Sequence, residues 1–179
     1  MHRQWLLSRL QNHIAHDPQE RDMQQRLTRF VHEHANCFDR ELLVGHITGS
    51  AWIVNPERSK VLMIHHRKLN RWLQPGGHSD GDPNTLQVAL REAREETGLD
   101  SIQPVSEAVF DVDIHTIPAR RDEPQHEHFD VRFLLQADDS LPILRTEETN
   151  DIAWMTLDEV LQHAQEDSIV RMLNKTRRT

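Results

Sequence analysis

The sequence of 179 residues has one cysteine, no tyrosine and no apolar run of about 18 residues, so no membrane span is expected. Because Cys37 stands alone, no disulfide can form within the chain, and a cytoplasmic location is expected. Positive charge is not in excess either, since 21 lysines and arginines face 29 aspartates and glutamates, for a formal net charge of −8. This balance argues against binding of long nucleic acid through a broad basic face.

Histidine, in contrast, is frequent, with 13 residues, and the apolar content of 36% is ordinary for a globular protein. Residues 1–42 are predicted to form a helical extension, because Trp5, Leu6 and Leu10 follow helical spacing. Asp17 and Pro18 are typical of an N-cap followed by the first position of a second helix. Residues 43–179 are predicted to form the main domain.

The β-pattern begins at about Gly45, where "HITGSAWIVN" and "KVLMIHH" flank the turn signal "NPERS" and predict a β-hairpin. Further strands are predicted at "EAVFDVDIHTI", "HEHFDVRFLLQA" and "DIAWMTL". The capping-box form of "TLDE" predicts a helix after the last strand. Strands on either side of one central helix, with helices near both ends, predict an α/β fold with a mixed sheet.

The central helix is predicted from "PNTLQVALREAREETG". Asp82 is expected to cap this helix, Pro83 suits its first position and Gly98 suits its end. A loop with three glycines, "KLNRWLQPGGHSDGDPN", leads into the helix and can bring backbone groups close to a ligand.

Three glutamates crowd one face of this helix. Glu92, Glu95 and Glu96 stand at i, i+3 and i+4, where like charges are mildly destabilising. A magnesium ion would turn the repulsion into a ligand set, because it prefers carboxylate and water oxygens. The alternative is a solvated helix face that Arg91 and Arg94 partly neutralise.

The segment "GHSDGDPNTLQVALREAREETGL", Gly77 to Leu99, resembles the Nudix box. Its second half matches the motif at every fixed position, and "WLQPGG" resembles the usual lead-in. One position departs, because Pro83 stands where the family expects a glutamate that supports the box arginine. Asp82 could substitute by capping the helix or by pairing with Arg91.

The resemblance implies a Nudix-like α/β/α sandwich and assigns roles to individual residues. Glu92, Glu95, Glu96 and the backbone oxygen of Gly76 would bind Mg²⁺ or Mn²⁺, and Arg91 would orient the glutamates. A further acidic residue before a late strand would act as metal ligand or general base. In "RTEETNDIAW" this residue is expected to be Glu148 rather than Glu147, although some family members use a glutamate of the box, here Glu95.

The implied activity is divalent-metal-dependent hydrolysis of a phosphoanhydride bond in a nucleoside diphosphate linked to another group. The expected partner is therefore a small nucleotide-type substrate, and a homodimer is possible because many Nudix proteins dimerise. One alternative is a nucleotide-binding or regulatory module with little turnover. Another is an isoprenyl diphosphate isomerase, which would need a catalytic cysteine, and Cys37 lies away from the motif.

Substrate contacts are predicted from residues outside the box. Arg67 and Arg71 could meet phosphates, and Trp72 could stack on a base or pack beneath the loop. His126 and His128 lie on one side of a predicted strand, where they could contact substrate or ligate zinc. Both readings of this histidine pair stay open at the level of the sequence.

Overall fold

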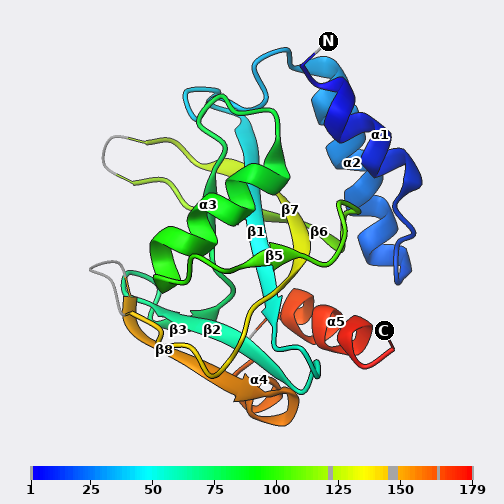
Figure 1. Cartoon of the computed structure of the whole chain (residues 1–179). Helices are drawn as coiled ribbons and strands as arrows, with labels where there is room; N and C mark the ends of the chain where they lie inside the picture. Colours follow the sequence, from blue (N-terminus) through cyan, green and yellow to red (C-terminus); the bar gives the residue numbers. More distant parts are fainter. Residues whose placement is uncertain (1, 121–122, 145–148, 165, 179) are drawn as a thin grey trace.

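The computed structural model describes residues 2–120, 123–144, 149–164 and 166–178, shown in Figure 1. Helices near both ends of the chain flank one mixed sheet, and a central helix follows the glycine-containing segment. In chain order the elements are α1 (Gln4–Asn12), α2 (Pro18–Glu33), β1 (Gly45–Val54), β2 (Lys60–His66), β3 (Arg71–Leu73), β4 (Gly76–His78), α3 (Thr85–Thr97), β5 (Gln103–Pro104), β6 (Asp111–Ile117), β7 (His126–Gln136), β8 (Thr149–Thr156), α4 (Leu157–His163) and α5 (Asp167–Thr176).

The eight strands form one sheet in which β1 is central, with the order β3-β2-β1-β7-β5. β4 also pairs with β1, β6 with β7 and β8 with β2. Only the long pairing of β1 with β7 is parallel among the strand pairs described, and it aligns Gly45 with Glu127 through Val54 with Gln136. The predicted β1–β2 hairpin is present, and the mixed sheet is confirmed.

Helices cover both faces of the sheet (Figure 1). Because side chains alternate along a strand, Ile47, Ala51 and Ile53 of β1 share a core with α1, α2 and α3. Trp52 and Val54 point the other way and pack with residues of α4 and α5. The predicted α/β fold is therefore confirmed, and no described helix is long and apolar enough to cross a membrane.

The N-terminal helices are part of the main core. Asp17 caps α2 by accepting a hydrogen bond from the backbone N–H of Glu20 at 2.8 Å, as predicted. Leu6, Leu10 and Leu27 are buried in the same cluster as the sheet residues facing α3. The division of the chain at residue 42 stays a prediction, but these apolar contacts join its two sides.

The start of α3 differs from the prediction. Asn84, not Asp82, is the N-cap, and its side chain accepts a hydrogen bond from the N–H of Gln87 at 3.3 Å. Asp82 instead accepts from the N–H of Asn84 at 2.9 Å, and Pro83 lies before the helix. The end is as predicted, because Gly98 adopts the left-handed conformation at φ 69°.

A network of buried charges joins elements that are distant in the sequence. The fully buried carboxylate of Asp111 on β6 accepts hydrogen bonds from Arg171 and Lys175 of α5 at 2.8 Å. Arg132 of β7 lies 3.4 Å from the same carboxylate. Lys175 also bonds to Glu20 of α2, so α2, the sheet and α5 share one set of ion pairs.

Neighbouring groups keep these buried acids ionised. Burial alone would raise the pKa of Glu20, but hydrogen bonds from His13 and Lys175 lower it to about 2. Burial likewise opposes ionisation of Asp113, yet the charge of Arg132 holds its pKa well below the usual range. The network therefore contributes to folding only while its carboxylates stay charged.

We predict that Glu20→Gln lowers the free energy of unfolding near neutral pH by about 3 kcal/mol, because it leaves Lys175 partly uncompensated in the interior. The pKa of Glu20 is depressed from 4.5, so its contribution is present above that pH and is lost as pH falls through about 2. Chemical denaturation at several pH values measures both effects. Glu33→Gln, an exposed change on the same helix, is the control. Equal stability of the two variants would contradict the prediction.

Candidate functional site

The glycine pair at the start of β4 lies between β1 and α3. Gly76 pairs with Ser50 of β1, and Gly77 pairs with Gly49. A Cβ at Gly76 would collide with Ser50, and one at Gly77 would collide with the carboxylate of Glu92. Glycine at position 76 therefore keeps β4 close to β1, whereas glycine at position 77 leaves room for the end of the Glu92 side chain.

The three box glutamates have different surroundings. Glu96 is 6% exposed and accepts a hydrogen bond from the N–H of Gly76 at 2.9 Å. Glu92 is half-buried, and Glu95 is exposed. The helix thus presents a graded set of carboxylates, the most buried of which is anchored to the glycine segment.

Arg91 links the glycine segment to the first glutamate. Its Nη2 donates to the carbonyl oxygen of His78 and to Oε1 of Glu92, both at 2.8 Å. Burial raises the pKa of Glu92. The negative charges of Glu95 and Asp80 raise it further, whereas Arg91 lowers it. A cation at this carboxylate would relieve the same electrostatic cost.

These residues fit a hard divalent cation by the chemistry of their donors. Glu92, Glu95 and Glu96 offer carboxylate oxygens on one helical face, which is what magnesium prefers. Magnesium usually retains several waters and uses few protein carboxylates, so the glutamates need not converge on one point. The predicted ligand role of the Gly76 carbonyl stays a prediction, whereas its N–H is already used by Glu96.

Three of the predicted substrate contacts precede the box: Arg67 lies in the turn after β2, and Arg71 and Trp72 lie on β3. Arg67 and Arg71 are exposed, and Arg71 forms an ion pair with Glu166 at 3.2 Å. Trp72 on β3 is half-buried and packs against the apolar cluster that Trp52 and Val54 form with residues of α4 and α5, which agrees with the packing alternative. Glu147 and Glu148 lie outside the described residues.

The pair His126 and His128 lies on β7 as predicted, but further histidines that the sequence analysis missed lie next to it. His46 of β1 and His78 of β4 gather with His128, and the ring centroids of these three residues are 4.7–5.1 Å apart. His126 lies beside them, with its centroid 5.2 Å from that of His128. The signal that could have found His46 is the polar alternation of His46, Thr48 and Ser50 along a central strand, where apolar residues are usual.

Cys37 is fully buried next to the N-terminal helices. Burial raises the pKa of its thiol to about 11. A nucleophilic cysteine needs access and a thiolate, so this residue does not serve as a catalytic thiol. The isomerase alternative, which depended on it, loses its chemical basis.

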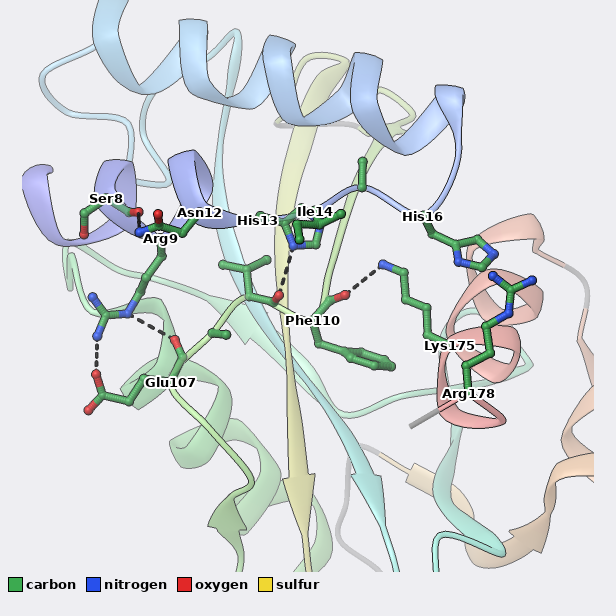
Figure 2. A pocket seen from close by; sticks show the side chains of 13 residues that line it. Ser8, Arg9, Asn12, His13, Ile14, His16, Glu107, Phe110, Lys175 and Arg178 are labelled. Carbon is green, nitrogen blue, oxygen red and sulfur yellow. Dashed lines mark hydrogen bonds and ion pairs between the residues drawn. The ribbon is translucent and has the colours of Figure 1, made fainter.

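A pocket of about 760 Å³ lies elsewhere, between the end of α1, residues 107–110 and the end of α5 (Figure 2). Its polar groups largely satisfy one another: Arg9 pairs with Glu107, and Lys175 donates to the carbonyl oxygen of Phe110 at 2.8 Å. His13 Nδ1 lies 3.0 Å from the carbonyl oxygen of Val109. None of the lining residues belongs to the box, so this pocket is separate from the glutamates.

Residues 46–174 match the family model of the NUDIX domain. The match covers more than half of the chain, and the chain therefore belongs to the NUDIX family. This finding agrees with the box residues and with the packing of α3 against the glycine segment.

Two curated relatives match part of the chain. The chain is 30% identical over 103 residues to the asymmetrical bis(5'-nucleosyl)-tetraphosphatase of Rattus norvegicus, a match covering 57% of this chain and 63% of the relative. It is 32% identical over 85 residues to a probable DHNTP pyrophosphohydrolase of Lactococcus lactis subsp. cremoris, covering 46% of this chain and 50% of the relative. The matches thus span less than two thirds of each relative.

Solved structures share the fold. An Ap4A hydrolase binary complex from C. elegans aligns with a TM-score of 0.60 and 15% identity, over 74% of this chain and 95% of that one. The E. coli dihydroneopterin triphosphate pyrophosphohydrolase aligns with a TM-score of 0.58 and 14% identity, over 74% and 96%. At such identities the likeness shows the fold alone, and it confirms the Nudix-like α/β architecture.

We predict that Gly77→Ala weakens binding of Mn²⁺ to the box by roughly tenfold, because the added Cβ displaces the Glu92 carboxylate. Titration calorimetry measures the affinity. In a Glu92→Gln background the same change should add little, since the displaced ligand is already altered. Additive losses in the double variant would show that Gly77 acts by another route.

We also predict that Cys37 resists thiol reagents in the native protein, because it is buried and its pKa is raised to about 11. A colorimetric thiol assay near pH 8 should show a slow reaction in buffer and prompt release of one equivalent in denaturant. Rapid labelling of the native chain would refute its burial.

Proposed function

We propose that this protein hydrolyses a phosphoanhydride bond in a nucleoside diphosphate linked to another group, with a divalent metal bound at the box glutamates. The observation that carries the proposal is the placement of Glu92 and Glu96 against the glycine segment, with Glu95 on the same helix and Glu96 tied to the N–H of Gly76. The family membership and the names of the two curated relatives, a tetraphosphatase and a pyrophosphohydrolase, support the same reaction class.

The chain's own residues prepare the reaction by positioning. Arg91 holds Glu92 and the carbonyl oxygen of His78, so it fixes the helix relative to the glycine segment. Gly76 holds the Glu96 carboxylate in one orientation. When bound, Mg²⁺ or Mn²⁺ would neutralise phosphate charge and lower the pKa of an attacking water.

Proton removal from that water is assigned to an acidic residue. Glu148 remains the proposed general base or further metal ligand. Glu95 is the alternative base, because it is an exposed box glutamate with the other two metal ligands beside it. Their separate contributions are measurable as pH profiles of turnover in Glu148→Gln and Glu95→Gln.

Substrate recognition is proposed for the residues around the β2–β3 turn and β7. Arg67 and Arg71 would meet phosphate oxygens, and Trp72 would border the base. His126 and His128 remain candidates for substrate contact. The substrate is proposed to be a small nucleotide-type molecule, and a cytoplasmic location and a homodimer remain predictions.

The test is a panel of substrates: dinucleoside tetraphosphates, dihydroneopterin triphosphate, nucleoside triphosphates, nucleotide sugars and ADP-ribose. Each is incubated with magnesium, with manganese and with chelator, and products are resolved by chromatography. Metal-dependent cleavage of one class would support the proposal. Tight metal-dependent binding without cleavage would favour the regulatory alternative instead.

Glu96→Gln and Glu95→Gln should each lower turnover of the preferred substrate by about a hundredfold or more, because each removes a charged oxygen from the metal set. Circular dichroism should show an unchanged fold. Asp100→Asn, an exposed change just beyond the box, is the matched control and should keep full activity. A near-normal rate in either glutamine variant would show that the assigned metal site is wrong.

A further inference from the structure

Imidazole groups from three strands converge on the sheet face opposite α3. His46 comes from β1, His78 from β4 and His128 from β7, and one ring nitrogen of each lies within 4.8 Å of those of the other two. Among the described residues, this is the only set of three or more potential ligand atoms that meets this limit. His126 adds a fourth ring, with its Nε2 3.4 Å from Nε2 of His128.

The spacing of these nitrogens matches that of ligands around one metal ion. Tetrahedral zinc with bonds of about 2.0–2.1 Å places neighbouring ligand nitrogens about 3.3–3.4 Å apart. Nε2 of His46 lies 3.1 Å from Nε2 of His128, and the His126–His128 separation is 3.4 Å. His46 and His128 therefore already have the separation of two ligands of one ion, and His78 lies within 4.8 Å of both. His126 is close to His128 but lies outside this set of three, so its ring would have to move toward the ion.

Hydrogen bonds between neutral histidines are the competing explanation, but they leave part of the cluster unexplained. His46 is 1% exposed, and its Nδ1 has no hydrogen-bond partner within the described structure. The two atoms that face each other in His46 and His128 are both Nε2. In a hydrogen bond one of them must donate and the other accept, whereas a metal ion would bind the lone pair of each. A buried ring nitrogen without a hydrogen-bond partner, such as Nδ1 of His46, costs stability.

Burial favours neutral imidazoles, the form that binds metal. Burial lowers the pKa of His46 to about 4 and that of His128 to about 2, and neighbouring histidines add to both shifts. Arg40 lies 3.0 Å from Nδ1 of His78, but it also pairs with Asp80 at 2.7 Å. Arg40 therefore keeps an anionic partner if a metal takes that nitrogen.

We propose that His46, His78 and His128, with His126 as the fourth ligand, form a site for a transition metal ion of the zinc class. Imidazole nitrogens suit zinc, copper and nickel, whereas the box carboxylates suit magnesium. The two sites differ in ligand chemistry, and the histidine site does not depend on the proposed hydrolysis. An ion bound here would crosslink β4 to β1 and β7. It would also stabilise the segment around His78, whose carbonyl oxygen accepts a hydrogen bond from Arg91.

The test is zinc binding by the full chain, freed of metal with chelator and returned to buffer with excess magnesium to occupy the carboxylates. Mass spectrometry of bound metal and titration calorimetry should give about one zinc ion per chain. A His46→Gln/His128→Gln double variant should bind at least about tenfold more weakly. A His32→Gln/His163→Gln variant, which changes two exposed histidines, should bind as the unmodified chain does.

Two further readouts separate ligand loss from misfolding. Zinc should raise the unfolding temperature of the unmodified chain and of the control variant, but not that of the double variant. Cobalt(II) added to the unmodified chain should give the intense visible absorption of a tetrahedral site, a measurement that needs no variant. The absence of zinc binding, a weak octahedral cobalt spectrum, or equal zinc affinity in the double variant would each overturn the proposal.

Discussion

The fold depends on one buried carboxylate, that of Asp111, and on the cations gathered around it. Arg171 and Lys175 donate to it at 2.8 Å, and Arg132 lies 3.4 Å away. Glu20 balances Lys175 from α2, so the N-terminal and C-terminal helices are fixed to the same strand pair. Buried ion pairs are weak evidence for net stability, but a broken one is costly. The network therefore mainly determines how α2, the sheet and α5 are placed relative to one another, because any packing that separated them would leave buried charges unpaired.

The sheet face that carries Arg132 is polar along much of the β1–β7 pairing, and its polar residues follow one another in layers along the two strands. Histidines occupy one end, Thr48 and Ser50 donate to Asp130 in the middle, and Asp130 in turn accepts from Arg132 at the ionic layer. The opposite face of the two strands is apolar and packs against α3 and the N-terminal helices. The box helix is therefore held by apolar core packing on one face, while hydrogen bonds and ion pairs hold the other face together.

Local features of this structure could be predicted from sequence, whereas long-range ones could not. The helix that carries the box glutamates and the Asp17 cap depend on residues within a few helical turns, and both predictions were confirmed. The Asp82 cap was wrong, because Asn84 competes for the same role two residues later. The histidine cluster joins residues up to 82 positions apart through the register of β1 and β7. The Asp111 network joins Glu20 of α2 to Lys175 of α5, 155 positions apart, through the packing of helices on the sheet, and no local pattern encodes either arrangement.

Strand β4 shows how three residues can serve both faces at once. The N–H of Gly76 holds Glu96, and Gly77 leaves room for Glu92. The next residue, His78, sends its ring to His46 and His128 while its carbonyl oxygen receives Arg91. Because side chains alternate along a strand, a shift of one residue in its pairing with β1 would misplace the glycines and turn His78 away from the other histidines. The register of this short strand thus couples the carboxylate set to the imidazole set through a single backbone.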